Sequence, residues 1–209
     1  MLLSSIKGKL LPPWPRTRLI LASNSPRRAE ILRNAGFAFE VRPAHIDEKR
    51  RERESGRAYA LRLAKEKAGA VAERVKRSSG AVVVGADTIV LAQGRILGKP
   101  QDVREARRML RLLSNKTHEV LTGVCVVSMP EGKTLSHVES TRVHFVKLSS
   151  RQIDDYIATG EPFDKAGAYG IQGLGGRFID RIGGCYFNVM GLPISRVWSM
   201  LRRLGESKG

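Results

Sequence analysis

The segment Leu19–Gly36 constrains the fold most, because its pattern predicts a buried strand that leads directly into a helix. The apolar run Leu19–Ala22 is typical of a strand inside a sheet. Ser25 suits the N-cap of a helix, and Pro26 suits its first position, where the missing backbone N–H costs nothing. Gly36 supplies the expected stop. The segment is therefore interpreted as a strand, a tight turn and a helix.

Two arginines, Arg27 and Arg28, fall in the first turn of this predicted helix. The helix dipole favours acidic residues at that end, so their placement needs a reason. A bound anion supplies one, because the free N–H groups, the hydroxyls of Ser23 and Ser25 and two guanidinium groups would converge on a phosphate. The alternative is a basic helix start that faces solvent. The glycine spacing of a Walker phosphate loop is absent.

The charge balance narrows the possible partners. With 37 Lys and Arg against 20 Asp and Glu, the 209-residue chain has a formal charge of +17, which attracts nucleotides, nucleic acids or acidic membrane surfaces. This charge is scattered and has few aromatic residues among it, so solvated helix faces explain it more simply, and nucleic-acid binding is not favoured. No apolar run approaches the length of a membrane span, so no membrane partner is expected.

Cysteine usage and the N-terminus bear on location and domain organisation. Cys125 and Cys185 form no C-x-x-C motif, which indicates a reducing compartment without a zinc site or a disulfide framework and predicts a cytoplasmic protein. Residues 1–17 are basic, contain several prolines and lack the apolar core of a secretory signal, so they are interpreted as an arm. Residues 18–205 are expected to form a single domain.

Hydrophobic periodicity predicts the remaining elements. Helices are expected at 58–76, after Asp102 as N-cap, from 149 or 150 to 160, and from 193 onward; strands are expected at 37–41, 81–84, 89–91, 120–127 and 134–146. The glycine-rich segment Glu161–Gly184 is expected to be a long loop. A loop of that length in a compact domain usually has a function.

Asp87 stands out as a candidate for chemistry. It lies between two strongly apolar runs, where a carboxylate is costly unless it is paired, binds a metal or works as a base. The alternative is a turn aspartate that satisfies its own backbone. Glu48, Lys67 and Lys99 are ambiguous when taken alone. The histidines show no metal-ligand spacing.

Five motifs, taken together, resemble the Maf family of nucleoside triphosphate pyrophosphatases. They are SNSPRR at 23–28, LAKEKA at 63–68, GADTIV at 85–90, GKP at 98–100 and DKAGAYGIQG at 164–173, and they occur in the family's order. Any one of them is weak, whereas all five in register are specific. The resemblance spans roughly residues 19–204 and leaves the N-terminal arm outside.

The resemblance implies hydrolysis of a noncanonical or pyrimidine nucleoside triphosphate between its α and β phosphates, with a divalent metal cation (Mg²⁺, Mn²⁺ or Co²⁺) as cofactor. It implies a mixed α/β fold, in which an elongated twisted sheet is flanked by helices and holds a central nucleotide-binding cleft, often in a homodimer. The SPRR, DT and YGIQG sequences are similar to the dTTP/UTP subgroup. By that match, base specificity is expected from Arg27, Thr88 and Gln172.

The other site residues follow from the same resemblance and from charge. A triphosphate carries about four negative charges, so its site needs several cations and a metal. Phosphate contacts are expected from Ser23, Ser25, Arg28, Lys67 and Lys99. Glu48 and Asp87 are expected near the metal, with Asp87 as the proton acceptor, and whether Asp87 is base, ligand or both stays open.

Two other functions stay open at this point. One is a hydrolase of modified purine nucleotides on the same scaffold, which a panel of nucleotides would distinguish. The other is a basic nucleic-acid-binding module, whose affinity would fall steeply with salt.

Overall fold

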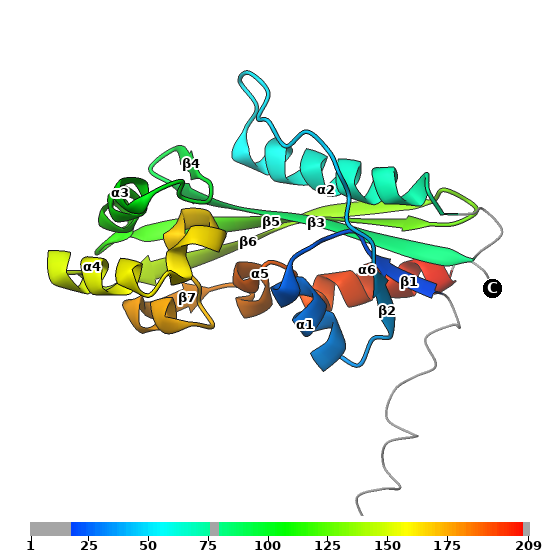
Figure 1. Cartoon of the computed structure of the whole chain (residues 1–209). Coiled ribbons are helices and arrows are strands. Elements are labelled where there is room, and N and C mark those ends of the chain that lie inside the picture. Colours follow the sequence, from blue (N-terminus) through cyan, green and yellow to red (C-terminus); the bar gives the residue numbers. More distant parts are fainter. Residues whose placement is uncertain (1–17, 76–79, 207–209) are drawn as a thin grey trace, which may run out of the picture.

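The computed structural model describes residues 18–75 and 80–206, so the arm expected at residues 1–17 lies outside the described residues. A seven-stranded mixed sheet runs through the molecule in the order β2-β1-β3-β5-β6-β7, and β4 pairs with β3 (Figure 1). The strands are β1 (Arg18–Leu21), β2 (Phe39–Val41), β3 (Ala81–Ala92), β4 (Arg95–Leu97), β5 (Thr117–Ser128), β6 (Thr134–Phe145) and β7 (Ile179–Gly183). The expected mixed α/β class is confirmed.

Helices cover both faces of this sheet (Figure 1). They are α1 (Pro26–Asn34), α2 (Gly56–Ala72), α3 (Val103–Leu113), α4 (Ser150–Ala158), α5 (Tyr186–Met190) and α6 (Ile194–Glu206). Successive side chains of β3 point to opposite faces of the sheet, which explains why helices cover both. Val82 and Val84 pack with α1 and α6, whereas Val83 packs with α2 on the opposite face. Among the described residues, no helix has the length and apolar character that crossing a membrane requires.

β3 is one continuous strand, whereas the sequence predicted a break at residues 85–88. Every residue from Val82 to Leu91 pairs with β5 in a single antiparallel register. Asp87 therefore lies within a strand, opposite Gly123, and the alternative of a turn aspartate is wrong. Tertiary pairing overrides the low strand propensity of glycine and aspartate here.

One edge of β3 has two short partner strands with a gap between them. β1 pairs with Ala81–Val84, and β4 pairs with Val90–Ala92. Between these pairings, residues 85–89 have no partner strand on that edge within the described part of the chain. The chain leaves β1 after Leu21 and turns into α1. This gap leaves the central part of β3 open on one side.

Two glycines let α2 approach the sheet closely. A Cβ atom added to Gly85 would lie 2.4 Å from the backbone oxygen of Ala64, and one added to Gly123 would lie 2.2 Å from that of Ala60. Real Cβ atoms do not approach backbone oxygens so closely, so only glycine fits at either position. The small residues of α2 thus rest directly on β3 and β5, next to the gap.

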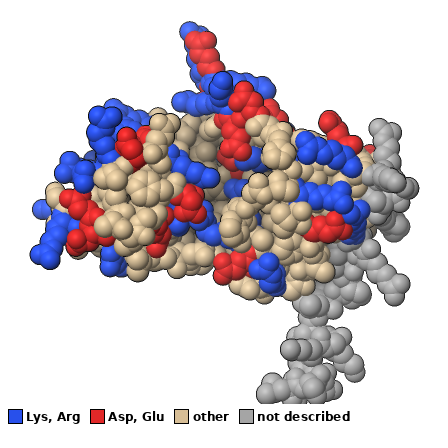
Figure 2. Space-filling view, viewed as in Figure 1, with Lys and Arg blue, Asp and Glu red and all other residues tan. Residues whose placement is uncertain are grey.

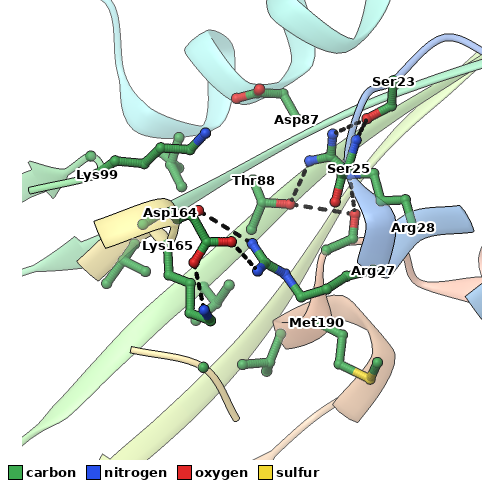
Figure 3. Close-up of a pocket in the computed structure, with 18 of the residues that line it drawn as sticks. Ser23, Ser25, Arg27, Arg28, Asp87, Thr88, Lys99, Asp164, Lys165 and Met190 are labelled. Atoms are coloured by element: carbon green, nitrogen blue, oxygen red, sulfur yellow. Dashed lines mark hydrogen bonds and ion pairs between the residues drawn. The ribbon is translucent and has the colours of Figure 1, made fainter. Parts of the chain in front are cut away.

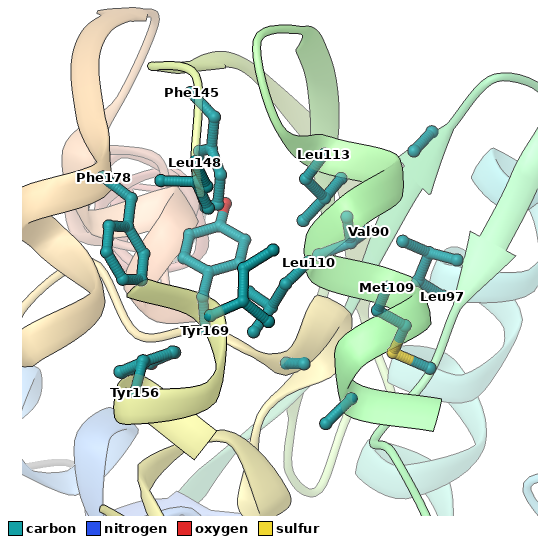
Figure 4. Close-up of a cluster of buried hydrophobic side chains, with 14 of the residues drawn as sticks. Val90, Leu97, Met109, Leu110, Leu113, Phe145, Leu148, Tyr156, Tyr169 and Phe178 are labelled. Atoms are coloured by element: carbon teal, nitrogen blue, oxygen red, sulfur yellow. The ribbon is translucent and has the colours of Figure 1, made fainter. Parts of the chain in front are cut away.

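The segment predicted as a long loop from Glu161 to Gly184 is largely ordered. It contains the 3₁₀ helices η2 (Glu161–Asp164), η3 (Ala166–Ala168) and η4 (Leu174–Phe178), followed by β7. Its aromatic side chains Tyr169 and Phe178 are buried in a cluster with residues of α3 and α4 (Figure 4). The prediction failed because glycine content marks turns but hides the apolar residues between them.

Smaller differences concern the ends and faces of elements. The predicted Asp102 cap is confirmed, because its Oδ1 accepts from the Glu105 backbone N–H at 2.6 Å. Val103, the first residue of α3, is exposed although it is apolar. The strand predicted at 37–41 begins only at Phe39, and α2 begins at Gly56 with Ser55 as its N-cap, two residues earlier than expected.

Candidate active site

A pocket of about 810 Å³ opens at the gap beside β3. Its volume lies in the range of small-molecule sites. In Figure 2 this face is hollowed near its middle, and basic side chains line the hollow. All ten residues that the sequence marked as site candidates line this pocket: Ser23, Ser25, Arg27, Arg28, Glu48, Lys67, Asp87, Thr88, Lys99 and Gln172.

Lys67 and the carboxylates of Asp87 and Glu48 form a connected charged group in the pocket. The Nζ atom of Lys67 lies 2.7 Å from Oδ1 of Asp87 and 2.8 Å from Oε1 of Glu48. Asp87 and Lys67 are each 8% exposed, whereas the Glu48 side chain is 57% exposed. Lys67, which is ambiguous from the sequence alone, therefore reaches from α2 across to β3.

Burial raises the pKa of Asp87 above its ordinary value, and the positive charges of Lys67 and Arg28 act against that rise. Burial is the larger effect, so this carboxylate binds a proton more readily than an exposed aspartate does. A carboxylate in a cleft with a perturbed pKa and a specific charge partner is a candidate for acid–base chemistry. The environment of Asp87 thus suits a proton acceptor held close to its partner cation.

Arg28 joins three parts of the pocket wall. Its guanidinium donates to the Gly191 carbonyl at 2.8 Å, to Ser23 Oγ at 3.0 Å and to Thr88 Oγ1 at 3.1 Å (Figure 3). Burial lowers the pKa of Arg28, and the negative charge of Asp87 opposes that effect. Arg28 is buried, so the solvated helix start that the sequence left open does not describe it. Its expected phosphate contact stays a prediction.

Behind Thr88 lies a buried polar chain that the sequence did not reveal. The hydroxyls of Thr88 and Thr122 are 2.9 Å apart, and Thr122 donates to the Asn188 carbonyl at 3.0 Å. The Asn188 side chain donates to the Val120 carbonyl at 2.9 Å and to Thr141 Oγ1 at 3.0 Å. These bonds fix α5 against β5 and β6. This chain of hydrogen bonds could not be predicted from the sequence, because the residues that form it are far apart along the polypeptide.

Arg27 reaches across the pocket to the segment after α4. Its Nη1 atom lies 2.9 Å from Oδ2 of Asp164, whose other carboxylate oxygen lies 2.5 Å from Nζ of Lys165 (Figure 3). A second link spans the same opening, because Gln172 Nε2 lies 3.4 Å from Oε2 of Glu30. The expected specificity residues Arg27 and Gln172 thus both connect α1 with the glycine-rich segment.

The remaining expected phosphate ligands are less engaged. Lys99 is exposed, points into the pocket (Figure 3) and has no hydrogen-bond or ion-pair partner among residues 18–75 and 80–206. Ser25 holds the N-cap position of α1, but its side chain makes no cap hydrogen bond. The hydroxyl of Ser25 and the ammonium of Lys99 are therefore available to a ligand.

The glycine-rich segment is organised by Glu161, which the sequence did not single out. Its carboxylate accepts from the backbone N–H groups of Leu174 at 2.8 Å and Gly175 at 3.1 Å, and from the Tyr156 hydroxyl at 2.8 Å. Lys165 also donates to the Glu161 carbonyl at 2.8 Å. These contacts fix the turn that carries Gln172.

The residues present fit a magnesium-like cation. One carboxylate oxygen of Asp87 and one of Glu48 both contact the Lys67 ammonium, so the two carboxylates face a common position. In the described part of the chain, no group of three or more His, Cys, Asp or Glu side chains forms a complete protein cage. Mg²⁺ is usually held by one or two carboxylates together with substrate phosphates and water, so two carboxylates are a suitable set.

A family model and a search of known protein sequences both find relatives that match most of this chain. A family model described as Maf-like protein matches residues 18–204. The dTTP/UTP pyrophosphatase of Koribacter versatilis (strain Ellin345) is 51% identical over 187 residues, covering 90% of this chain and 94% of that protein. The dTTP/UTP pyrophosphatase of Geobacillus sp. (strain WCH70) is 51% identical over 188 residues, covering 90% and 98%.

Among solved structures, the Staphylococcus aureus Ham1 protein aligns with a TM-score of 0.39 and 12% identity, over 62% of this chain and 72% of that one.

Proposed function

The chain belongs to the Maf family, and we propose that it is a nucleoside triphosphate pyrophosphatase acting on dTTP and UTP. The products are the nucleoside monophosphate and pyrophosphate. The observation that carries the proposal is the buried Asp87–Lys67 pair in a basic pocket of nucleotide size. About half of the residues are identical to those of relatives named dTTP/UTP pyrophosphatase, which supports the same substrates.

The charges of the pocket suit a triphosphate. Arg28 and Lys67 lie on its wall, and Lys99 reaches in from the loop after β4. Several cations are needed to offset about four negative charges, and each charge-assisted bond to a phosphate oxygen is strong. Two further basic residues line the same pocket: Lys165, which belongs to the motif at 164–173, and Arg50, which the sequence did not single out. We infer that these basic residues hold the phosphate chain along β3.

A divalent cation, held by Glu48 and Asp87, would neutralise phosphate charge and activate the α-phosphorus. Asp87 accepts a proton from the attacking water as the water oxygen forms a bond to the α-phosphorus. The bond between that phosphorus and the bridging oxygen breaks, and its electron pair leaves with pyrophosphate. The positive charge of Lys67 favours the charged form of Asp87 and so acts against the rise in pKa that burial causes.

Base recognition is assigned to Gln172, Arg27 and Thr88, which line the same pocket. Gln172 is exposed on the glycine-rich segment, and its amide offers both a donor and an acceptor to a pyrimidine edge. Arg27 lies across the opening from it, bonded to Asp164. The Thr88 hydroxyl is engaged by Arg28 and Thr122, so its contribution to specificity is the shape of the wall.

The test is a panel of dTTP, UTP, CTP and GTP with Mg²⁺ or Mn²⁺, in which pyrophosphate is measured. Faster release from dTTP and UTP is the expected result, and Gln172→Ala should reduce the preference for these over GTP. The exposed Gln101→Ala, outside the pocket, is the matched control. A preference for purines would favour the alternative hydrolase, and release of single phosphates would overturn the proposal.

A further inference from the structure

Glu48 is held in the pocket without regular secondary structure. It lies in the irregular segment 42–55 between β2 and α2, which projects beyond the sheet (Figure 1). Its side chain is more exposed than buried, yet its Oε1 atom lies 2.8 Å from Nζ of Lys67. An exposed carboxylate on an irregular segment needs contacts that fix its backbone, because a metal site tolerates little displacement of its ligands.

Two side chains from the first turns of α2 supply those contacts. The hydroxyl of Tyr59 donates to the backbone carbonyl of Glu48 at 2.6 Å. The Nη2 atom of Arg62 donates to the carbonyl of the next residue, Lys49, at 3.0 Å. Tyr59 and Arg62 are three residues apart, so they lie on one face of the helix. The backbone carbonyls of Glu48 and of the residue after it are therefore bonded to the same helix that carries Lys67.

Arg62 is itself fixed in place by acidic residues. Its guanidinium contacts both carboxylate oxygens of Glu54, at 2.7 and 2.9 Å, and an oxygen of Glu66 at 3.0 Å. It also lies over the Tyr59 ring, 5.5 Å from the centroid. The hydrogen bonds from Arg62 lower the pKa of Glu54 to about 2, so this pair stays charged at ordinary pH. Because Glu54 belongs to the same segment as Lys49, Arg62 anchors that segment at two points.

We propose that Tyr59 and Arg62 are positioning residues that hold Glu48 for the divalent cation. This inference rests on the proposed function, because it takes Glu48 as a metal ligand. Neither side chain supplies an oxygen to the cation, and they act only through the backbone of the Glu48 segment. Residues that orient metal ligands typically change metal affinity by 10-fold to 100-fold when they are lost.

The experiment measures Mn²⁺ binding to the full chain without nucleotide, by calorimetry or by electron paramagnetic resonance. Tyr59→Phe removes the hydroxyl that donates to the Glu48 carbonyl, and Arg62→Gln removes the guanidinium that donates to the Lys49 carbonyl. Each should raise the Kd for Mn²⁺ about 10-fold. Lys65→Gln is the matched control, because Lys65 is exposed on the same helix and outside the pocket. Thermal unfolding of each variant shows whether it is folded.

Double variants with Glu48→Gln separate positioning from a general structural effect. If Tyr59 acts through Glu48, Tyr59→Phe should leave the Kd of the Glu48→Gln protein unchanged. The proposal is overturned if Tyr59→Phe and Arg62→Gln both bind Mn²⁺ as the parent does while Glu48→Gln binds it weakly. That result would leave the proposed function intact. Failure of the parent to bind Mn²⁺ at all would instead count against both.

Discussion

The ammonium of Lys67 lies 2.7 Å from a carboxylate oxygen of Asp87, and the two residues come from different layers of the fold. Asp87 lies in the middle of β3, and Lys67 lies near the middle of α2. They meet because Gly85 and Gly123 let the helix rest on the sheet without intervening side chains. The close helix–sheet contact and the charged pair are therefore parts of one arrangement.

Replacing Lys67 should destabilise the fold, because it would leave the Asp87 carboxylate buried without its nearest cation. Lys67→Met is expected to lower the free energy of unfolding by about 3 kcal/mol, as measured by urea denaturation. Adding Asp87→Asn should recover part of this loss, since the neutral side chain needs no counter-charge. Lys65→Met, at an exposed position on the same helix, should change stability by less than about 0.5 kcal/mol. Equal effects at both positions would contradict the buried pair.

Arg28 and Arg27 should differ sharply when each is replaced by lysine. An ammonium cannot reproduce the three-way contact of the buried Arg28 guanidinium with Gly191, Ser23 and Thr88. Arg28→Lys should therefore cost about 2 kcal/mol of unfolding free energy. Arg27→Lys alters a more exposed ion pair and should cost less than about 1 kcal/mol. A larger loss at Arg27 would contradict the stabilising role of the three buried contacts of Arg28.

Alanine at Gly123 should force α2 away from the sheet. Its Cβ would meet the backbone oxygen of Ala60, which no change of rotamer can move aside. Gly123→Ala is expected to cost about 3 kcal/mol in chemical denaturation. Gly69→Ala is the matched control, because nothing lies within 4 Å of its added Cβ. As a replacement in the interior of α2, it should stabilise the protein by about 1 kcal/mol.

His118 should make the fold sensitive to acid. It is buried beside Phe145, its Nε2 atom lies 2.8 Å from the Tyr169 hydroxyl, and burial lowers its pKa from 6.5 to about 4. Above pH 6.5 neither the folded nor the unfolded state binds this proton, so His118 adds no pH dependence there. Between pH 6.5 and about 4 only the unfolded state binds it, so stability falls by up to about 3 kcal/mol.

His118→Gln removes this titration and keeps a side chain that can bond to the Tyr169 hydroxyl. Unfolding free energies of both proteins at pH 7, 6, 5 and 4 give the comparison. The parent should lose stability faster than the variant over this range. Parallel curves would show that His118 titrates alike in the folded and unfolded states.

The local units of the fold could be predicted from the sequence, because their signals are short-range. The strand and helix of Leu19–Gly36, the Asp102 cap and the helix that starts at Ser150 all depend on neighbouring residues. The continuity of β3 could not be predicted, since Asp87 and Gly85 disfavour strands and only pairing with β5 decides their conformation.

Some residues of the candidate site could be predicted from the sequence, whereas the contacts that hold them in place could not. The family resemblance and the charges identified residues that line one pocket, although Glu48, Lys67 and Lys99 are ambiguous when each is taken alone. The Thr122–Asn188 chain, the Glu161 hub and the Tyr59–Arg62 anchor were missed. Each consists of ordinary polar residues that gain meaning only when the fold brings distant segments together.

The most direct test of the proposed chemistry is the product formed from dTTP by the parent protein and by Asp87→Asn in the presence of Mg²⁺. The parent should release thymidine monophosphate and pyrophosphate in equal amounts. Asp87→Asn should be slower by at least about 100-fold, because it loses the proton acceptor, while Asp155→Asn, exposed on α4, should match the parent. Release of orthophosphate, or an Asp87→Asn protein as active as the parent, would contradict the account.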